Sequence, residues 1–294
     1  MVGSLRERRL VFTHVPKAAG TTLDYILGRI AGLRNEVRFR AKGTLYGQFL
    51  GQGKIEAAAG LRNAAPSDIA SARFLGGHVP TTAWDGIPGV GDAAFVTILR
   101  DPIDRMISHY RYGIARKGWE SDASPAELTR AGHMVDNLQV RQISGCLDAS
   151  EPCTDAMLDS ALEILRERYA VVGFVDKFDA ILGALIALLG WPDVLYSAHQ
   201  VGKIAIDDDR VAGIREECRD LNTFDERLVN AVRRHGDVWV NRVDRGEPPS
   251  ADDAVIVVTP KFKDHGRVIP IFPKSALPEF QIRMRSEGVE IERV

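Results

Sequence analysis

The 294-residue sequence has little of three features that often indicate a function class. It has only three cysteines, Cys146, Cys153 and Cys218, and their spacing matches no zinc or redox motif. Its net charge is −2, which argues against a general nucleic-acid binder, because such proteins usually carry a marked basic excess. An anionic ligand must therefore be held by a local cluster of positive charge. Whether Cys146 pairs with Cys153 stays open, because sequence does not fix disulfide pairing.

Long apolar runs are also missing. The longest, AILGALIALLGW at 180–191, is well short of the ~20 residues that a membrane-spanning helix needs. Asp179 and Pro192-Asp193 bound this run, so we expect a buried helix. The basic start, SLRERRL, leads directly into a predicted strand without the apolar stretch of a signal peptide. We therefore expect a cytoplasmic protein with no membrane span.

Strand patterns alternate with helical patterns over most of the chain. Runs rich in β-branched and aromatic residues, typical of buried strands, lie at 8–15, 72–79, 93–100 and 169–176. Helical patterns lie at 21–32, 102–118, 135–145, 155–168, 177–189, 208–221 and 224–235. This alternation predicts an α/β fold with a P-loop-like parallel β-sheet flanked by helices.

The character of the chain changes near residue 245. DRGEPPSADD has the composition of a linker, and two β-like runs follow, AVIVV at 254–258 and RVIPIF at 267–272. We predict one domain at 1–244 and a C-terminal linker with a β-hairpin-like arm at 245–294. An arm exchanged between subunits and an intramolecular hairpin explain this tail equally well, so homo-oligomerisation stays open.

The segment VFTHVPKAAGTT at 11–22 predicts a strand, a turn of small residues and a helix. Such a turn directs backbone N–H groups toward one centre, and the helix adds the positive end of its dipole. Lys17 supplies a full charge, and Thr21 and Thr22 supply hydroxyl groups. The Walker pattern G-x-x-x-x-G-K-[ST] is absent, because the lysine precedes the glycine. The alternative is an ordinary strand–turn–helix corner with a solvated lysine.

A second segment, VTILRDPIDRMISHYRY, offers another anion site. Arg100 ends a predicted strand, and Ser108 lies two turns into the following helix, so a guanidinium and a hydroxyl could converge there. The alternative is that Arg100 forms a salt bridge at the strand end with Asp101 or Asp104.

Together, the two segments resemble the nucleotide-binding elements of sulfotransferases that use 3′-phosphoadenosine 5′-phosphosulfate (PAPS). In that family, a P-K-[small]-[small]-[GS]-[ST]-[ST] loop binds the 5′-phosphosulfate, and an R-D-P-x-x-R-x-x-S-x-Y segment binds the 3′-phosphate. The loop residues here are Pro16, Lys17, Ala18, Ala19, Gly20, Thr21 and Thr22, and the second segment supplies Arg100 and Ser108. Many relatives have Thr-Gly in place of Ala18-Ala19, so one hydroxyl contact is missing but the small-residue turn is kept.

Three further stretches resemble the branch with uronyl 2-O-sulfotransferases and related carbohydrate sulfotransferases: GGHVP, DNLQVRQISG and YAVVGFVDKFDAIL. The resemblance spans roughly 9–235. It implies that His78 is the catalytic base and that Asn137 and Arg141 lie near the acceptor; the alternatives are a buried structural histidine at a strand end and a solvated helix surface. Lys203 either closes over the nucleotide or belongs to an exposed turn. The eukaryotic relatives are anchored in the Golgi membrane, so the lack of an anchor here indicates a bacterial-type cytoplasmic enzyme.

The resemblance implies transfer of a sulfuryl group from PAPS to a hydroxyl of a small molecule or glycan, most simply a saccharide, with PAP as product and without a metal. Lys17 would stabilise the bridging oxygen, and His78 would accept the hydroxyl proton. His14 and His109 are rival bases that we interpret as scaffold residues. The alternatives are a divergent P-loop kinase, which would need magnesium ligands, and a non-catalytic nucleotide-binding module. The identity of the acceptor stays open.

Overall fold

The computed structural model describes residues 9–23, 26–27, 37–38, 72–85, 87, 90–146, 148–189, 193–196, 208–240, 254–258, 271–273 and 292–293. The central sheet has the strand order β2-β3-β1-β4-β5-β7. Its strands are β1 (Leu10–Thr13), β2 (Val37–Arg38), β3 (Ala72–Gly77), β4 (Ala94–Leu99), β5 (Tyr169–Phe174) and β7 (Val238–Val240). All pairs are parallel except β5 with β7, which is antiparallel. The predicted α/β fold with a mainly parallel sheet is confirmed.

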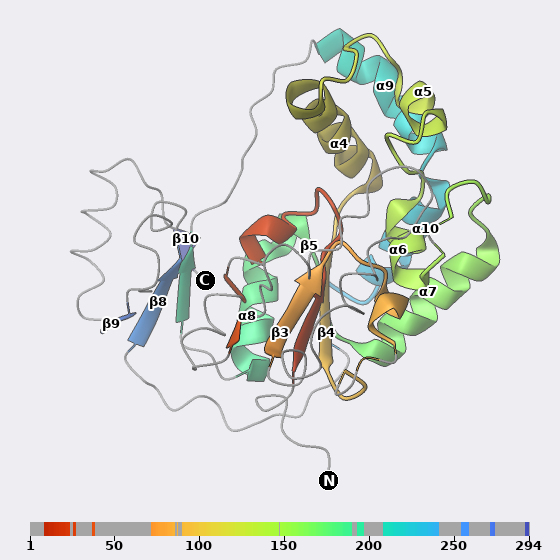
Figure 1. The fold of residues 1–294 in the computed structure, drawn as a ribbon. Coiled ribbons are helices and arrows are strands. Elements are labelled where there is room, and N and C mark those ends of the chain that lie inside the picture. Colours follow the sequence, from red (N-terminus) through yellow and green to blue (C-terminus); the bar gives the residue numbers. More distant parts are fainter. Residues whose placement is uncertain are drawn as a thin grey trace, which may run out of the picture.

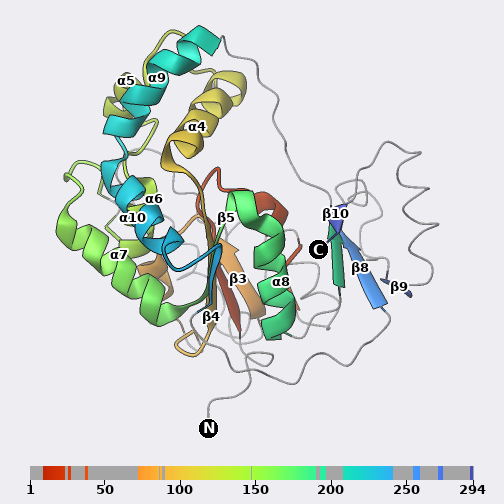
Figure 2. The ribbon, with the colours of Figure 1, turned by 180° about the vertical axis from the view of Figure 1, so that it is seen from behind.

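Both faces of this sheet are covered by helices because its strands are apolar on both sides. In β1, Val11 packs into one buried cluster, whereas Leu10 and Phe12 pack into the other, as the two-residue period of a strand requires. The helices α6 (Leu138–Ser144), α7 (Asp155–Arg168) and α10 (Thr223–Arg233) cover the Val11 face. The opposite face is covered by helical residues 20–23 and 26–27 and by α8 (Phe178–Leu189), the helix predicted from the longest apolar run (Figures 1 and 2).

A third group of helices lies beyond the carboxyl ends of the strands (Figure 1). It comprises α4 (Pro102–Lys117), α5 (Pro125–Arg130) and α9 (Asp208–Asp220), which pack around Met106, Tyr110 and Cys218. Pro102 stands in the first turn of α4, as predicted, and the Asp101 carboxylate accepts a hydrogen bond from the Asp104 N–H at 2.9 Å. This cap fixes the direction in which α4 leaves β4. Short 3₁₀ helices, η2 (Thr81–Trp84) and η3 (Val175–Lys177), follow β3 and β5.

A second sheet has the order β10-β6-β8-β9. Its strands are β6 (Asp193–Tyr196), β8 (Ala254–Val258), β9 (Ile271–Pro273) and β10 (Glu292–Arg293). The predicted strand at 254–258 is confirmed, and β9 overlaps the end of the predicted run RVIPIF. β8 pairs with β9 in antiparallel fashion and with β6 in parallel fashion, so this sheet takes one strand from the region before 244. The division of the chain at 244 stays a prediction.

The two sheets are joined through β6, which packs on α8. The Tyr196 hydroxyl donates to the Asp179 carboxylate at 2.7 Å, and the Tyr196 ring lies 5.0 Å from the ring of Phe178. The small sheet therefore extends the structure on the α8 side (Figures 1 and 2). No helix in the described part of the chain has the length and apolar character required to cross a membrane.

Candidate functional site

Three neighbouring parallel strands each end in a basic residue. His14 follows β1, His78 follows β3 and Arg100 follows β4. β1 lies between the other two strands, because the chain builds β2 and β3 on one side of it and then crosses to β4 on the other. Open parallel sheets bind ligands at such a reversal of strand order, outside the carboxyl ends of the strands. The fold therefore brings together basic residues that lie far apart in the sequence.

The loop after β1 has an unusual backbone. Lys17 and Ala19 have φ values of 67° and 53°, in the left-handed region that non-glycine residues rarely adopt. Backbone hydrogen bonds from Ala18 N–H to Val15 C=O at 3.3 Å and from Thr22 N–H to Ala19 C=O at 3.0 Å close the turn. Turns of alternating hand gather N–H groups into anion-binding concavities.

The same loop makes a close approach at Gly20. A Cβ at this position would overlap the imidazole ring of His14, so only glycine fits without movement. His14 is itself 3% exposed. The turn therefore needs a residue without a side chain at position 20, because a side chain there would collide with His14. The Walker pattern does not predict this requirement.

Lys17 and Arg100 meet above the strand ends. One Nη of Arg100 donates to the Lys17 carbonyl oxygen at 3.0 Å, and the Lys17 ammonium lies 4.3 Å from the centroid of the Tyr112 ring. Burial lowers the pKa of Lys17, and the nearby Arg100 charge lowers it further. Burial also lowers the pKa of Arg100, although Asp104 and Asp101 act in the opposite direction.

Neither cation has a carboxylate at ion-pair distance among the described residues. Asp101 caps α4, and Asp104 pairs with Arg215 at 3.2 Å. The alternative prediction of a strand-end salt bridge is therefore not what the structure shows. Two positive groups held close together without a carboxylate partner form a local electrostatic site for an anion.

His78 is held as a neutral imidazole. Its Nδ1 lies 2.9 Å from the carbonyl oxygen of His14. Because a carbonyl oxygen only accepts, Nδ1 carries the proton and Nε2 carries the lone pair. Burial lowers the pKa of His78 to about 4; the hydrogen bond to His14 raises the pKa and the charge of Lys17 lowers it. At neutral pH, His78 therefore has the protonation state of a base.

The rival histidines lie deeper. The His14 ring centroid lies 4.0 Å from that of His78, and burial followed by the charge of His78 lowers the pKa of His14 well below its usual value. His109, on α4, packs its ring 5.3 Å from that of Trp119. Burial, then the Arg105 charge, lowers the pKa of His109 to about 3. Their interpretation as scaffold residues agrees with this burial and stays a prediction.

The remaining predicted nucleotide ligands surround these groups. Thr21 and Ser108 are half-buried, whereas Pro16, Ala18 and Thr22 are buried in the loop and in the helix that follows it. Ser108 lies on α4, two turns after the residue that caps this helix. Lys203 lies outside the described residues.

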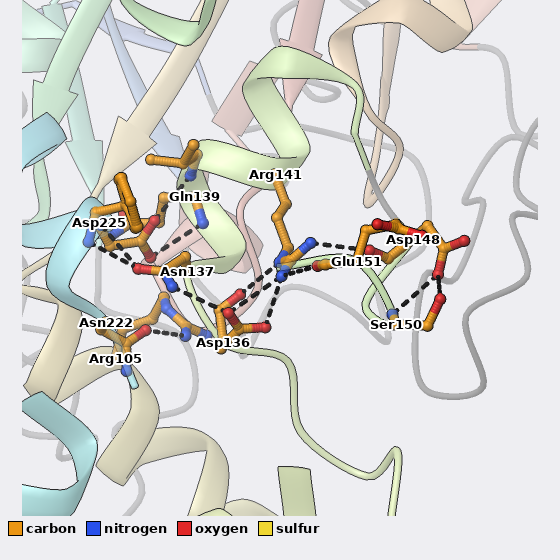
Figure 3. Close-up of polar contacts among 12 residues, drawn as sticks. Arg105, Asp136, Asn137, Gln139, Arg141, Asp148, Ser150, Glu151, Asn222 and Asp225 are labelled. Atoms are coloured by element: carbon orange, nitrogen blue, oxygen red, sulfur yellow. Dashed lines mark hydrogen bonds and ion pairs between the residues drawn. The ribbon is translucent and has the colours of Figure 1, made fainter. Parts of the chain in front are cut away.

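The two residues predicted near the acceptor belong to an internal network (Figure 3). Asn137 precedes α6 at its N-cap position, and its side chain serves the other helix: its Oδ1 accepts hydrogen bonds from the N–H groups of Phe224 and Asp225 at 2.9 and 3.2 Å, in the first turn of α10. The Asp225 carboxylate in turn accepts from the N–H groups of Gln139 and Val140 at 3.1 and 2.8 Å, in the first turn of α6. The two helix N-termini therefore cap each other.

Arg141 is only 1% exposed and fixes the loop that follows α6 (Figure 3). Its guanidinium donates to the carbonyl oxygens of Asp136, Asp148 and Glu151 at 3.0, 2.9 and 2.8 Å. It also forms an ion pair with the Asp136 carboxylate at 3.0 Å. These contacts give Asn137 and Arg141 structural roles, and their contact with an acceptor stays a prediction.

Two residues that the sequence analysis missed are Gln139 and Gln142. Gln139 is 0% exposed, and its amide pairs with both backbone groups of Arg100 at 3.0 Å. Gln142 is 1% exposed, and its Nε2 donates to the carbonyl oxygens of His14 and Val79 at 3.1 and 3.2 Å. The available signal was two amide side chains three residues apart on an otherwise apolar helix face.

The described residues thus define an α/β protein in which two partly buried cations, Lys17 and Arg100, lie close together at the switch point of its sheet. They include no group of histidine, cysteine and carboxylate side chains suited to a metal ion. Cys146, Cys153 and Cys218 are all free, so the pairing left open by the sequence is not formed here.

No protein-family model matches the chain, and no curated protein matches it. Among solved structures, the mouse sulfotransferase SULT7A1 complexed with PAP aligns over 72% of this chain at 14% identity with a TM-score of 0.35. The alignment spans 64% of the mouse protein, which is less than two thirds of its length. A sulfotransferase from Alicyclobacillus acidocaldarius aligns over 77% of this chain and 96% of its own, at 17% identity and a TM-score of 0.37. With TM-scores this low, function has to be inferred from the residues of this chain.

Proposed function

We propose that the protein is a PAPS-dependent sulfotransferase that moves a sulfuryl group to an acceptor hydroxyl. The observation that carries the proposal is the meeting of Lys17, His78 and Arg100 at the carboxyl ends of β1, β3 and β4. Two cations that have no carboxylate partner in the described part of the chain suit an anionic donor, and a neutral imidazole suits proton removal.

The loop from Pro16 to Thr22 would hold the 5′-phosphosulfate, with Lys17 beside the bridging oxygen. Arg100 and Ser108 would hold the 3′-phosphate, and Lys203 would close over the nucleotide. Burial disfavours the charged forms of Lys17 and Arg100, and a bound polyanion would restore favourable electrostatics. Donor binding is therefore expected to raise the pKa of both groups.

The acceptor oxygen attacks sulfur as the bond from sulfur to the 5′-phosphate oxygen breaks. The hydroxyl proton moves to Nε2 of His78, and the negative charge that develops on the leaving PAP phosphate is stabilised by Lys17. The transferred group carries less negative charge than a phosphoryl group, so this reaction needs no metal ion. A neutral His78 with its proton fixed on Nδ1 supports the direction of proton transfer.

Binding of PAP tests the nucleotide part of the proposal. Calorimetry with EDTA present should detect PAP binding, and ATP–Mg²⁺ should not compete. Arg100→Met should weaken PAP binding about 10- to 100-fold, because one charged hydrogen-bond donor is lost. Binding of ATP–Mg²⁺ in place of PAP would contradict the proposal and favour the divergent kinase.

Transfer of radiolabelled sulfate from PAPS to a panel of saccharides, alcohols and phenols tests the reaction and the proposed saccharide acceptor. His78→Ala should lower turnover about 10²- to 10⁴-fold while sparing PAP binding. His235→Ala is the matched control, because His235 is exposed and lies at the end of α10. Retained turnover in His78→Ala would make His14 or His109 the base, and a protein that binds PAP but sulfates nothing would be a binding module.

A further inference from the structure

We infer that α6 positions the site through two glutamines, with Gln139 fixing the backbone of Arg100 and Gln142 fixing the proton on His78. The catalytic part of this inference rests on the proposed function. Gln139 and Gln142 lie one helical turn apart, so they extend from the same face of α6 toward the strand ends. Neither touches the expected ligands directly, and each acts through another residue.

Gln139 pairs with the peptide groups on both sides of Arg100. Its Oε1 accepts from the Arg100 N–H and its Nε2 donates to the Arg100 carbonyl oxygen, both at 3.0 Å. At this residue the chain leaves β4 before α4 begins, so neither group is paired within a strand or a helix. The amide of Gln139 therefore replaces a strand neighbour and sets the point from which the Arg100 side chain extends.

Gln142 connects the ends of β1 and β3. Its Nε2 donates to the carbonyl oxygen of His14, which follows β1, and to that of Val79, which follows His78. Both partners only accept, so the amide nitrogen must face them. Its Oε1 points elsewhere and has no hydrogen-bond partner among the described residues.

The His14 carbonyl oxygen therefore receives two donors, Gln142 Nε2 at 3.1 Å and His78 Nδ1 at 2.9 Å. The first donor holds this oxygen in place, and the second sets the tautomer of the base. Without Gln142, the carbonyl can move, and the proton of His78 can shift to Nε2, where it would block acceptance of the acceptor proton.

α6 is suited to this role because it is fixed at both ends. The Asp225 carboxylate caps its first turn. At its C-terminus, a Cβ on Gly145 would overlap the side chain of Thr82 in η2, so the helix end packs directly on the segment after β3. A helix held in this way can transmit a defined geometry to Arg100 and His78.

The tautomer is tested first in the unaltered protein. ¹⁵N NMR of the histidine side chains at pH 7 should show His78 as a neutral imidazole protonated at Nδ1. A proton on Nε2 would overturn the role of Gln142. This measurement needs neither acceptor nor turnover. The tautomer can therefore be as inferred in a protein that transfers no sulfuryl group, and sulfuryl transfer can occur in a protein whose tautomer differs.

Matched variants test the division of roles. Gln142→Met should shift His78 toward the Nε2–H form and lower kcat at least about tenfold, with PAP affinity within about twofold. Gln139→Met should weaken PAP binding about tenfold and leave the His78 tautomer unchanged. Gln142→Glu keeps the volume, and because its carboxyl faces two carbonyl oxygens it donates only while it is protonated, so the His78 tautomer should shift as the pH rises through the pKa of this carboxyl.

Two results would overturn the inference. Equal effects of the position-139 and position-142 variants on both PAP affinity and tautomer would show that α6 acts only as general scaffold. An unchanged tautomer in Gln142→Met, or in Gln142→Glu above the pH at which its carboxyl ionises, would show that the donor does not fix the proton. If Gln142→Met loses its cooperative unfolding transition, the unaltered protein and Gln142→Glu decide the question.

Discussion

On the α10 side of α6, Asn137 and Asp225 bond to each other's helix N-termini, whereas on the strand-end side Lys17 and Arg100 have no carboxylate partner among the described residues. The first region is buried and the second is partly buried, and both are polar. In the first, the carboxylate and the amide oxygen have donors within the protein. In the second, positive groups lower one another's pKa.

This difference separates groups that stabilise the fold from groups that are arranged for a ligand. Burial raises the pKa of Asp225, but the Arg105 charge and the N–H groups of Val140 and Gln139 lower it. These groups offset part of the cost of burying its charge. Among the described residues, Lys17 has no such partner and Arg100 has only the longer-range charges of Asp104 and Asp101, so the fold gains little from these two cations, and a bound anion would gain much.

The largest expected effect on stability is that of Asp225→Ala. The change removes the cap of α6 and the largest favourable charge acting on the fully buried guanidinium of Arg105. We expect the free energy of unfolding to fall by about 3–5 kcal/mol. Urea unfolding followed by circular dichroism measures it.

The control for Asp225→Ala is Asp237→Ala, which removes an exposed pair with Lys177 and should cost about 0–1 kcal/mol. A loss of less than about 1 kcal/mol in Asp225→Ala would contradict the comparison. The Asp225 network would then not be what stabilises this side of α6.

Acid should destabilise the strand-end region next. The pKa values of His78, about 4, and His109, about 3, lie below the usual 6.5, so the unfolded chain binds more protons between these values. Stability is therefore full above pH 6.5 and falls as the pH drops toward 4, on the order of 1 kcal/mol per pH unit for each histidine. Urea midpoints at pH 7 and pH 5 measure the slope.

His109→Gln should flatten this pH dependence, because one buried group that must stay neutral is removed. His235→Gln, at an exposed position, should leave the slope unchanged. Equal slopes in the His109→Gln variant and the unaltered protein would show that His109 does not control acid stability.

The third effect concerns the cap of α10. Asn137→Ala removes the acceptor for two N–H groups and places a Cβ-bearing residue without local hydrogen bonding at φ 44°. We expect a loss of about 1–2 kcal/mol. Asn137→Gly keeps the backbone conformation, so it should cost less than alanine. Thermal unfolding compares the two, and a change in acceptor KM at unchanged stability would instead support the predicted acceptor contact.

Much of the fold was predictable because its elements are long and locally patterned. The runs at 93–100 and 169–176 contain β4 and β5, and the apolar run at 180–191 overlaps most of α8. The strands β6 and β7 were not predicted, because three or four residues are too few to show a period. They depend on pairing with distant strands.

The positions of the candidate residues at strand ends were predictable to the same degree, and their roles stay predictions. Arg100 was placed at the end of a predicted strand by a local pattern, and His78 was singled out by the resemblance of GGHVP to a family segment. The roles of Gln139 and Gln142 depend on partners 39 and 128 residues away, and Asn137 bonds to a helix 88 residues away. Single-sequence patterns carry no information on such pairs, so polar residues chosen as ligands turned out to have internal partners.

The smallest expected effect on stability, that of Lys17→Met, tests the comparison most sharply. The ammonium has no carboxylate within ion-pair distance among the described residues, and its neighbour Arg100 repels it. Loss of the contact with the Tyr112 ring lowers stability, and relief of the repulsion from Arg100 raises it. The two effects oppose each other, so the free energy of unfolding should change by less than about 1 kcal/mol. Under the proposed function, sulfuryl transfer should nevertheless fall about 10²- to 10³-fold, because the charge proposed to stabilise the leaving oxygen is gone. Urea unfolding and labelled-sulfate transfer measure the two quantities, with exposed Lys177→Met as control. A large loss of stability would make Lys17 a structural residue like Arg141, and the two sides of α6 would no longer differ in kind.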